Sequence, residues 1–190
     1  LSLIMQQIFR SSFGAKEVSA TLPEWLLGSF QPTAEIDIPI NGVFVLGLAL
    51  VVTVGVYLFM FRSRWGLRMR ATVQNRVMAG AVGINTKKVD RVTFALGCGI
   101  AGVAGAAFTT IASTGPTTGS LYIVDSFMVV VFGGAASLLG TIASAFGIAQ
   151  AQSILQFFMT SSMGKVATLM VIVGILMMRP EGLFASKLRK

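Results

Sequence analysis

The segment FRSRWGLRMRATVQNRVMAGAVGINTKKVDR, residues 61–91, decides the fold of this chain. It carries eight Lys or Arg residues and a single acid, Asp90, while the twenty residues before Arg62 and the twenty after Arg91 carry no charge. An uncharged run of this length can cross a bilayer as a helix. Lys and Arg concentrate in the cytoplasmic loops of membrane proteins. The pattern therefore predicts a cytoplasmic loop between two membrane-spanning helices.

The composition is that of a membrane protein. Of the 190 residues, 54% are hydrophobic and only 12% are charged, and the mean hydropathy is +0.80. Soluble globular domains carry about 25% charged residues. The formal charge of +8 would ordinarily raise nucleic acid as a partner. Because cytoplasmic flanks of membrane spans are basic in any case, we expect membrane lipid and no nucleic acid around this chain.

Apolar runs predict about five membrane spans in an all-α, polytopic helical membrane protein, because open sheets and loops cannot satisfy their backbone groups in lipid. The run at 121–136 is barely long enough to cross. The predicted spans are 42–61, 92–111, 121–136, 140–158 and 166–178.

The distribution of charge predicts the sidedness. The net charge is −2 over residues 1–41, +7 over 62–91 and +3 over 179–190. Four predicted crossings separate the two basic segments, so both can lie in the cytoplasm, as a coupling loop and a tail. Residues 1–8 are interpreted as the tail of an earlier span. Residues 9–41 are interpreted as an outer loop, which lies outside with 112–120 and a short loop around Lys165. The chain begins with Leu, so we expect it to be the C-terminal part of a longer domain.

Apolar residues inside the basic loop recur at helical spacing and predict a short amphipathic helix. Gly83 is placed to end this helix, and Asn85 to cap the next span. Such a helix either lies in the lipid headgroups or docks onto a cytoplasmic partner, and the pattern alone supports both equally. The apolar residues are Val73, Val77, Met78, Ala81 and Val82.

Small residues four positions apart predict close helix packing. Gly97, Ala101 and Gly105 have this spacing in the second span, so we expect that span to be buried among neighbours. The fourth span repeats the spacing at Gly140 and Ser144 and at Ala143 and Gly147.

The residue inventory excludes several kinds of chemistry. The chain has no His, and its lone cysteine, Cys98, lies in an apolar run and is interpreted as a small packing residue. His/Cys metal sites and Ser-His-Asp hydrolysis are therefore not available. No G-x-x-x-x-G-K-[ST] phosphate loop occurs, so any ATP hydrolysis belongs to another chain. We expect no cofactor, no metal and no enzymatic activity.

Four blocks in collinear order carry a resemblance to a known family. They are LSLIMQQIFRSSFG (1–14), WGLRMRATVQNRVMAGAVGINTKKVDRVTFALGCGIAGVAGA (65–106), YIVDSFMVVVFGG (122–134) and RPEGLF (179–184). Together they resemble the permease subunits of branched-chain amino acid ABC importers, and most closely the urea importers within that family. The chain departs from the urea pattern at Ala136, Ser137 and Gln156.

The resemblance implies a subunit of the bacterial inner membrane. Its implied partners are a second permease, two cytoplasmic ATPases and a periplasmic urea-binding protein. The cytoplasmic loop looks like the coupling helix that such permeases insert into a cleft of the ATPase, which favours docking over the headgroup interpretation. The residues implied in this contact are Gln74, Asn75, Met78, Ala79 and Gly83.

A urea pathway needs hydrogen-bonding side chains, and the candidates are Asp125, Ser126, Gln6 and Gln7. Asp125 has three interpretations: a helix cap, a pathway lining, or a partner of Lys165 or of another subunit. An amino acid would need charges of both signs, and the predicted spans hold one acid and no cation. Alternatives are a branched-chain amino acid importer, a secondary transporter or channel, and a membrane scaffold without transport activity.

Overall fold

The structure is a computed structural model that describes residues 1–33, 36–134 and 137–182. Two compact units divide the chain, Leu1–Pro116 and Thr117–Lys190. The end of the predicted span at 136 and most of the predicted tail, 183–190, lie outside the described residues. Each unit is described by itself.

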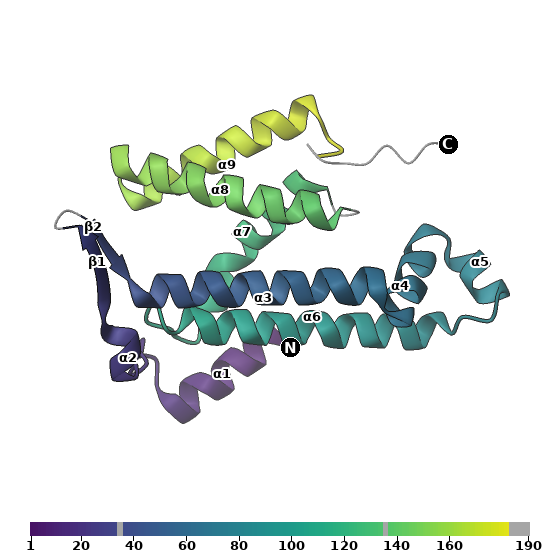
Figure 1. Cartoon of the computed structure of the whole chain (residues 1–190), viewed down its shortest axis with the longest axis horizontal. Coiled ribbons are helices and arrows are strands. Elements are labelled where there is room, and N and C mark those ends of the chain that lie inside the picture. Colours follow the sequence, from purple (N-terminus) through teal and green to yellow (C-terminus); the bar gives the residue numbers. More distant parts are fainter. Residues whose placement is uncertain (34–35, 135–136, 183–190) are drawn as a thin grey trace. The chain divides into compact units, whose positions relative to one another are not determined.

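Two long helices form the body of the first unit. α3 (Ile40–Arg62) and α6 (Thr86–Phe108) have 23 residues each and lie side by side (Figure 1). At 1.5 Å per residue, each is about 34 Å long, which is enough to cross a bilayer. α4 (Arg64–Gln74) and α5 (Arg76–Ala81) connect them at one end of the pair. The predicted basic loop is thus mostly helical, and α6 begins within it.

A glycine allows α4 to fold back directly after α3. The Ser63 hydroxyl caps α4 by accepting a hydrogen bond from the backbone N–H of Trp65, at 3.2 Å. A Cβ at Gly66 would overlap the carbonyl oxygens of Phe59 and Met60 in the last turn of α3. Met69 of α4 is only 3% exposed. The hairpin is therefore packed onto the end of the spans rather than loosely tethered.

The opposite end of the first unit holds the strand pair, in the segment that is predicted to lie outside the membrane (Figure 1). After α1 (Ser2–Phe13) and the single turn α2 (Glu24–Leu27), the strands β1 (Ser29–Thr33) and β2 (Ile36–Pro39) form an antiparallel hairpin. The chain is mostly helical, as predicted, but this hairpin was not expected. Strands are possible here because backbone groups outside the hydrocarbon are satisfied by water.

Three helices form the second unit. α7 (Thr118–Gly133), α8 (Leu138–Phe158) and α9 (Ser161–Met178) pack around Met128, Ile148 and Ile172, one buried residue from each helix. Flanking apolar side chains complete this core: Val129, Phe132, Leu169 and Leu176.

Small residues bring α7 and α8 close together. A Cβ at Gly133 would lie 2.6 Å from the carbonyl oxygen of Gly140 and from the hydroxyl of Ser144. Ser144 is 1% exposed. Its hydroxyl donates to the carbonyl oxygen of Val129 at 2.7 Å and also lies 2.9 Å from the carbonyl oxygen of Thr141. The spacing of Gly140 and Ser144 therefore marks a helix interface, as predicted.

Within the described residues, four helices are long and apolar enough to cross a membrane, and the 16-residue α7 is shorter. One prediction about the spans is wrong: Lys165 is not in a loop, because α9 begins at Ser161 and one lysine does not interrupt a helix. Gly97, Ala101 and Gly105 are exposed within this chain, so their burial among neighbouring helices stays a prediction.

Candidate functional site

The first candidate site is the end of the α4–α5 hairpin. The sequence predicts one helix through residues 73–82, but the structure has two helices that meet at Asn75. The backbone N–H of Asn75 ends α4 by donating to the carbonyl oxygen of Ala71, at 3.1 Å. Its side-chain oxygen caps α5 by accepting from the backbone N–H of Met78, also at 3.1 Å. Asn75 thus sets the angle between the two helices instead of lying on a continuous polar face.

Gly83 ends α5, as the sequence predicts. Its φ of +88° is in the left-handed region that favours glycine. The backbone N–H of Ile84 donates to the carbonyl oxygen of Ala79 at 3.0 Å, and the N–H of Gly83 donates to that of Gly80 at 3.1 Å. These two hydrogen bonds form a Schellman motif. Asn85 then caps α6 by accepting from the backbone N–H of Lys88, at 3.2 Å.

The hairpin exposes a group of apolar side chains. Val73 is 80% exposed, Val77 83%, Met78 63% and Val82 80%. Ala79, another predicted contact residue, is only 5% exposed and lies on the packed side of α5. We call the four exposed residues Val73, Val77, Met78 and Val82 the apolar knob. Gln74 is exposed beside it.

Charged side chains connect the hairpin to α6. Arg76, the first residue of α5, forms an ion pair with Asp90 of α6. The ring of Trp65 in α4 has the Arg68 guanidinium 5.2 Å from its centroid and the Lys88 ammonium 5.9 Å from it. The hairpin therefore presents apolar side chains on a rigid, basic support.

The second candidate site is an ion pair in the second unit. Asp125 lies near the middle of α7, whose N-cap is Thr117, so the interpretation of Asp125 as a helix cap is wrong. Its Oδ2 lies 3.7 Å from Nζ of Lys165 in α9. The side chains are 23% and 43% exposed, respectively. Charges in apolar helices are costly unless they are paired, and each residue here supplies the other's counter-charge.

The other predicted pathway residues lie on another face of α7 and in the first unit. Ser126 follows Asp125 by one position, about 100° further around the helix, and is exposed. Gln6 and Gln7 lie in α1 of the first unit. The sequence analysis gave pairing with Lys165 as one interpretation of Asp125, and the structure shows this pair, but the sequence placed Lys165 in a loop rather than in a helix. The available signal was its position as the single cation between residues 92 and 178, where Asp125 is the single acid.

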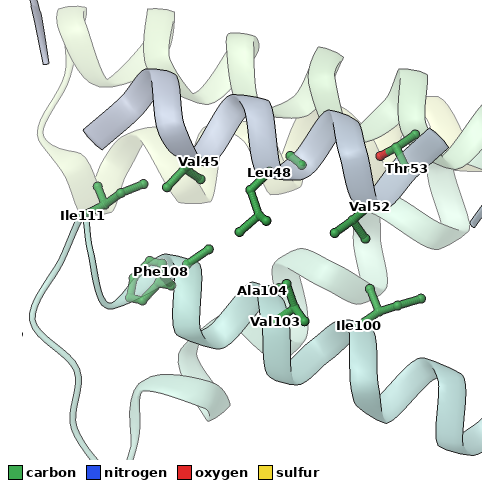
Figure 2. A pocket seen from close by; sticks show the side chains of 11 residues that line it. Val45, Leu48, Val52, Thr53, Ile100, Val103, Ala104, Phe108 and Ile111 are labelled. Atoms are coloured by element: carbon green, nitrogen blue, oxygen red, sulfur yellow. The ribbon is translucent and has the colours of Figure 1, made fainter. Parts of the chain in front are cut away.

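An apolar cavity of about 300 Å³ lies between α3 and α6. Figure 2 shows its walls: Val45, Leu48 and Val52 of α3 face Ile100, Val103, Ala104 and Phe108 of α6. Thr53 is the one residue with a side-chain hydroxyl in this lining. The cavity has no charged group and suits an apolar occupant rather than a polar solute.

The helices and their apolar surfaces define a multi-pass helical membrane protein. Residues 2–178 match the protein family described as branched-chain amino acid transport system / permease component. The chain belongs to this family. The family consists of permease components of transport systems rather than of enzymes.

Several curated relatives are similar over most of the chain. The probable branched-chain amino acid transport permease protein LivH of Methanocaldococcus jannaschii is 25% identical over 143 residues, or 72% of this chain and 45% of the relative. The high-affinity branched-chain amino acid transport system permease protein LivH of Salmonella typhimurium is 23% identical over 189 residues, 96% of this chain and 60% of the relative. The high-affinity branched-chain amino acid transport system permease protein BraD of Pseudomonas aeruginosa is 25% identical over 191 residues, 96% of this chain and 61% of the relative.

This chain therefore spans about half to three fifths of the length of these relatives. No solved structure matches it significantly.

Proposed function

We propose that this chain is part of the membrane subunit of an ATP-driven importer, an ABC transporter, and that the α4–α5 hairpin is its coupling element. The observation that carries the proposal is the apolar knob at the end of α3 and α6. A helix that docks into a cleft of another protein is expected to expose such a group within a polar surround.

The packing of the hairpin supports this mechanism. Gly66 seats α4 on the last turn of α3, and the ion pair between Arg76 and Asp90 joins α5 to α6. A displacement of the apolar knob by an ATPase would therefore be transmitted to both spans. Because the chain contains no phosphate loop, the ATPase is a separate subunit. A second permease and a periplasmic substrate-binding protein complete the proposed importer.

We propose urea as the substrate, on the basis of the blocks at 1–14, 122–134 and 179–184. A branched-chain amino acid is the second candidate, and two observations favour it. The relatives are described as branched-chain amino acid permeases. In addition, Lys165 in α9 supplies a cation beside Asp125, so an amino acid could find both counter-charges among these helices.

The test of coupling is Met78→Asp. A carboxylate at this exposed position should weaken docking into an apolar cleft because it would have to be desolvated there. We expect at least a tenfold loss of substrate uptake and of ATPase co-purification, with normal membrane insertion. Met78→Leu keeps an apolar side chain of similar volume and should stay within twofold of the wild type. If Met78→Asp retains full uptake and the ATPase, the hairpin is a headgroup helix and the proposal fails.

The test of the substrate is uptake of labelled urea and labelled leucine by cells that carry the complete importer. We expect urea uptake that disappears when the ATPase is inactivated. Leucine uptake without urea uptake would assign the amino acid instead.

A further inference from the structure

We infer that Asp125 and Lys165 together form a binding site for a small planar amide, in which Lys165 donates to the carbonyl oxygen and Asp125 accepts from an amino group. This inference rests on the proposed function of urea import. It gives Lys165 a role in substrate binding and assigns the two ends of the substrate to two helices.

The geometry of the pair leaves room for a third polar group. At 3.7 Å, Nζ of Lys165 and Oδ2 of Asp125 are close enough to neutralise each other but too far apart for a direct hydrogen bond. An ammonium has three donors and a carboxylate has about four acceptor positions, so both retain unused hydrogen-bonding capacity. A polar molecule that bridges the two groups would satisfy them better than their direct contact does.

The pair lies beside buried residues of both α7 and α9. Met128 of α7, three residues after Asp125, is in the buried core. On α9, Thr168 is 2% exposed and lies three residues after Lys165. Each charged residue thus shares a helix face with a buried residue and remains partly exposed itself. The site is anchored on one side and accessible on the other, as a transient binding site requires.

An aromatic ring holds the ammonium in place. Nζ of Lys165 lies 5.1 Å from the ring centroid of Tyr122, which precedes Asp125 by about one turn of α7. A cation over an aromatic face is stabilised without using its N–H donors in strong hydrogen bonds. The lysine is therefore positioned over α7 with donors available for a carbonyl oxygen.

The chemistry of urea matches this arrangement. One edge of the molecule presents a carbonyl acceptor beside an N–H donor. Hydrogen bonds of about 2.9 Å on that edge fit a donor and an acceptor that lie side by side. No net charge enters with the substrate, so the pair stays neutral when it is empty and when it is filled.

Two neutral double variants separate binding from a purely structural ion pair. Asp125→Asn/Lys165→Gln removes both charges and keeps a donor and an acceptor at each position. Asp125→Leu/Lys165→Met removes both charges and all hydrogen bonding. Neither leaves an unpaired charge in the membrane. In the complete importer, we expect the amide pair to retain urea uptake within tenfold of the wild type and the apolar pair to lose it by at least a hundredfold.

Equal urea uptake by the two double variants would overturn the inference, because a structural ion pair does not distinguish them. If the wild-type importer carries leucine but not urea, the proposed substrate fails first and the inference fails with it. If the wild type takes up urea and the two double variants do not differ, the proposed substrate stands and only the inference about the binding site is rejected.

A milder variant covers the case in which neither double variant assembles. Lys165→Arg keeps the charge and the pairing but changes the position of the donors. We expect the KM for urea uptake to rise at least fivefold while Vmax stays within twofold. An unchanged KM in an assembled Lys165→Arg importer contradicts a substrate contact.

Discussion

At the residue scale, close backbone contacts fix the corners of this fold. Gly66 lets α4 turn back onto α3, and Gly133 lets the end of α7 meet α8 beside Ser144. From the sequence, Gly133 with Gly134 is recognisable as a helix break. The need for glycine at position 66 cannot be recognised from the sequence. A side chain there would meet the carbonyl oxygens of Phe59 and Met60, and these lie close to Gly66 only because α4 folds back onto α3.

Gly66→Ala should destabilise the corner between α3 and α4. The new Cβ would meet backbone atoms, which cannot move aside as a flexible side chain can. Overpacking of this kind costs about 1–3 kcal/mol. We expect a lower midpoint of thermal unfolding for the detergent-solubilised importer and reduced co-purification of the ATPase.

The matched control is Gly55→Ala in the same helix pair, where a Cβ would meet nothing within 4 Å. Its unfolding midpoint should equal or exceed that of the wild type, since alanine favours helix by about 1 kcal/mol. Equal midpoints for Gly66→Ala and the wild type would show that α4 is not held by this contact.

At the scale of elements, the two caps at Asn75 and Asn85 define the hairpin. Asn85 was predictable because it directly precedes a long apolar run. Asn75 was not, because the apolar residues from Val73 to Val82 keep helical spacing across the break. Periodicity reports which face is apolar, and only the hydrogen bonds of Asn75 show where one helix ends and the next begins.

Asn75→Ala should impair coupling by removing the cap of α5. Loss of an N-cap costs about 1 kcal/mol, and without it α4 and α5 can join into one helix that displaces Met78. We expect a severalfold loss of substrate uptake, with little change in the amount of assembled importer. Asn75→Asp restores a capping oxygen and should recover most of the uptake. Similar losses in both variants would mean that the Asn75 amide itself contacts the ATPase.

The positions of the long apolar helices followed from apolar length, but their ends did not. α6 begins at Thr86, inside the basic loop, and α9 begins at Ser161, four residues before Lys165. Charged residues mark where a helix leaves the hydrocarbon rather than where it stops. The pairing of Asp125 with Lys165 was one of three interpretations of Asp125, and the structure brings the two side chains together although the sequence assigned Lys165 to a loop.

At the scale of the whole molecule, the charge distribution gives the first unit two different ends. The basic hairpin α4–α5 lies at one end of the α3–α6 pair (Figure 1). Near the other end, Val18 and Thr114 pair through two backbone hydrogen bonds of 2.9 and 3.0 Å, and Ser113 contacts Glu17. The segment before α3 and the segment after α6 thus meet at the same end of the helix pair. The predicted sidedness requires this, because it places both segments outside the membrane.

The topology predicts the accessibility of single cysteines to a membrane-impermeant maleimide, in a Cys98→Ser background because Cys98 is exposed. Ser113→Cys and Ser162→Cys replace exposed residues within the predicted outer loops and should react in intact cells. Lys87→Cys replaces an exposed residue at the start of α6 and should react only after permeabilisation. All three native residues are exposed, so a difference in labelling reports sidedness rather than burial. If Lys87→Cys reacts in intact cells while Ser113→Cys does not, the orientation is reversed, and the apolar knob cannot reach a cytoplasmic ATPase.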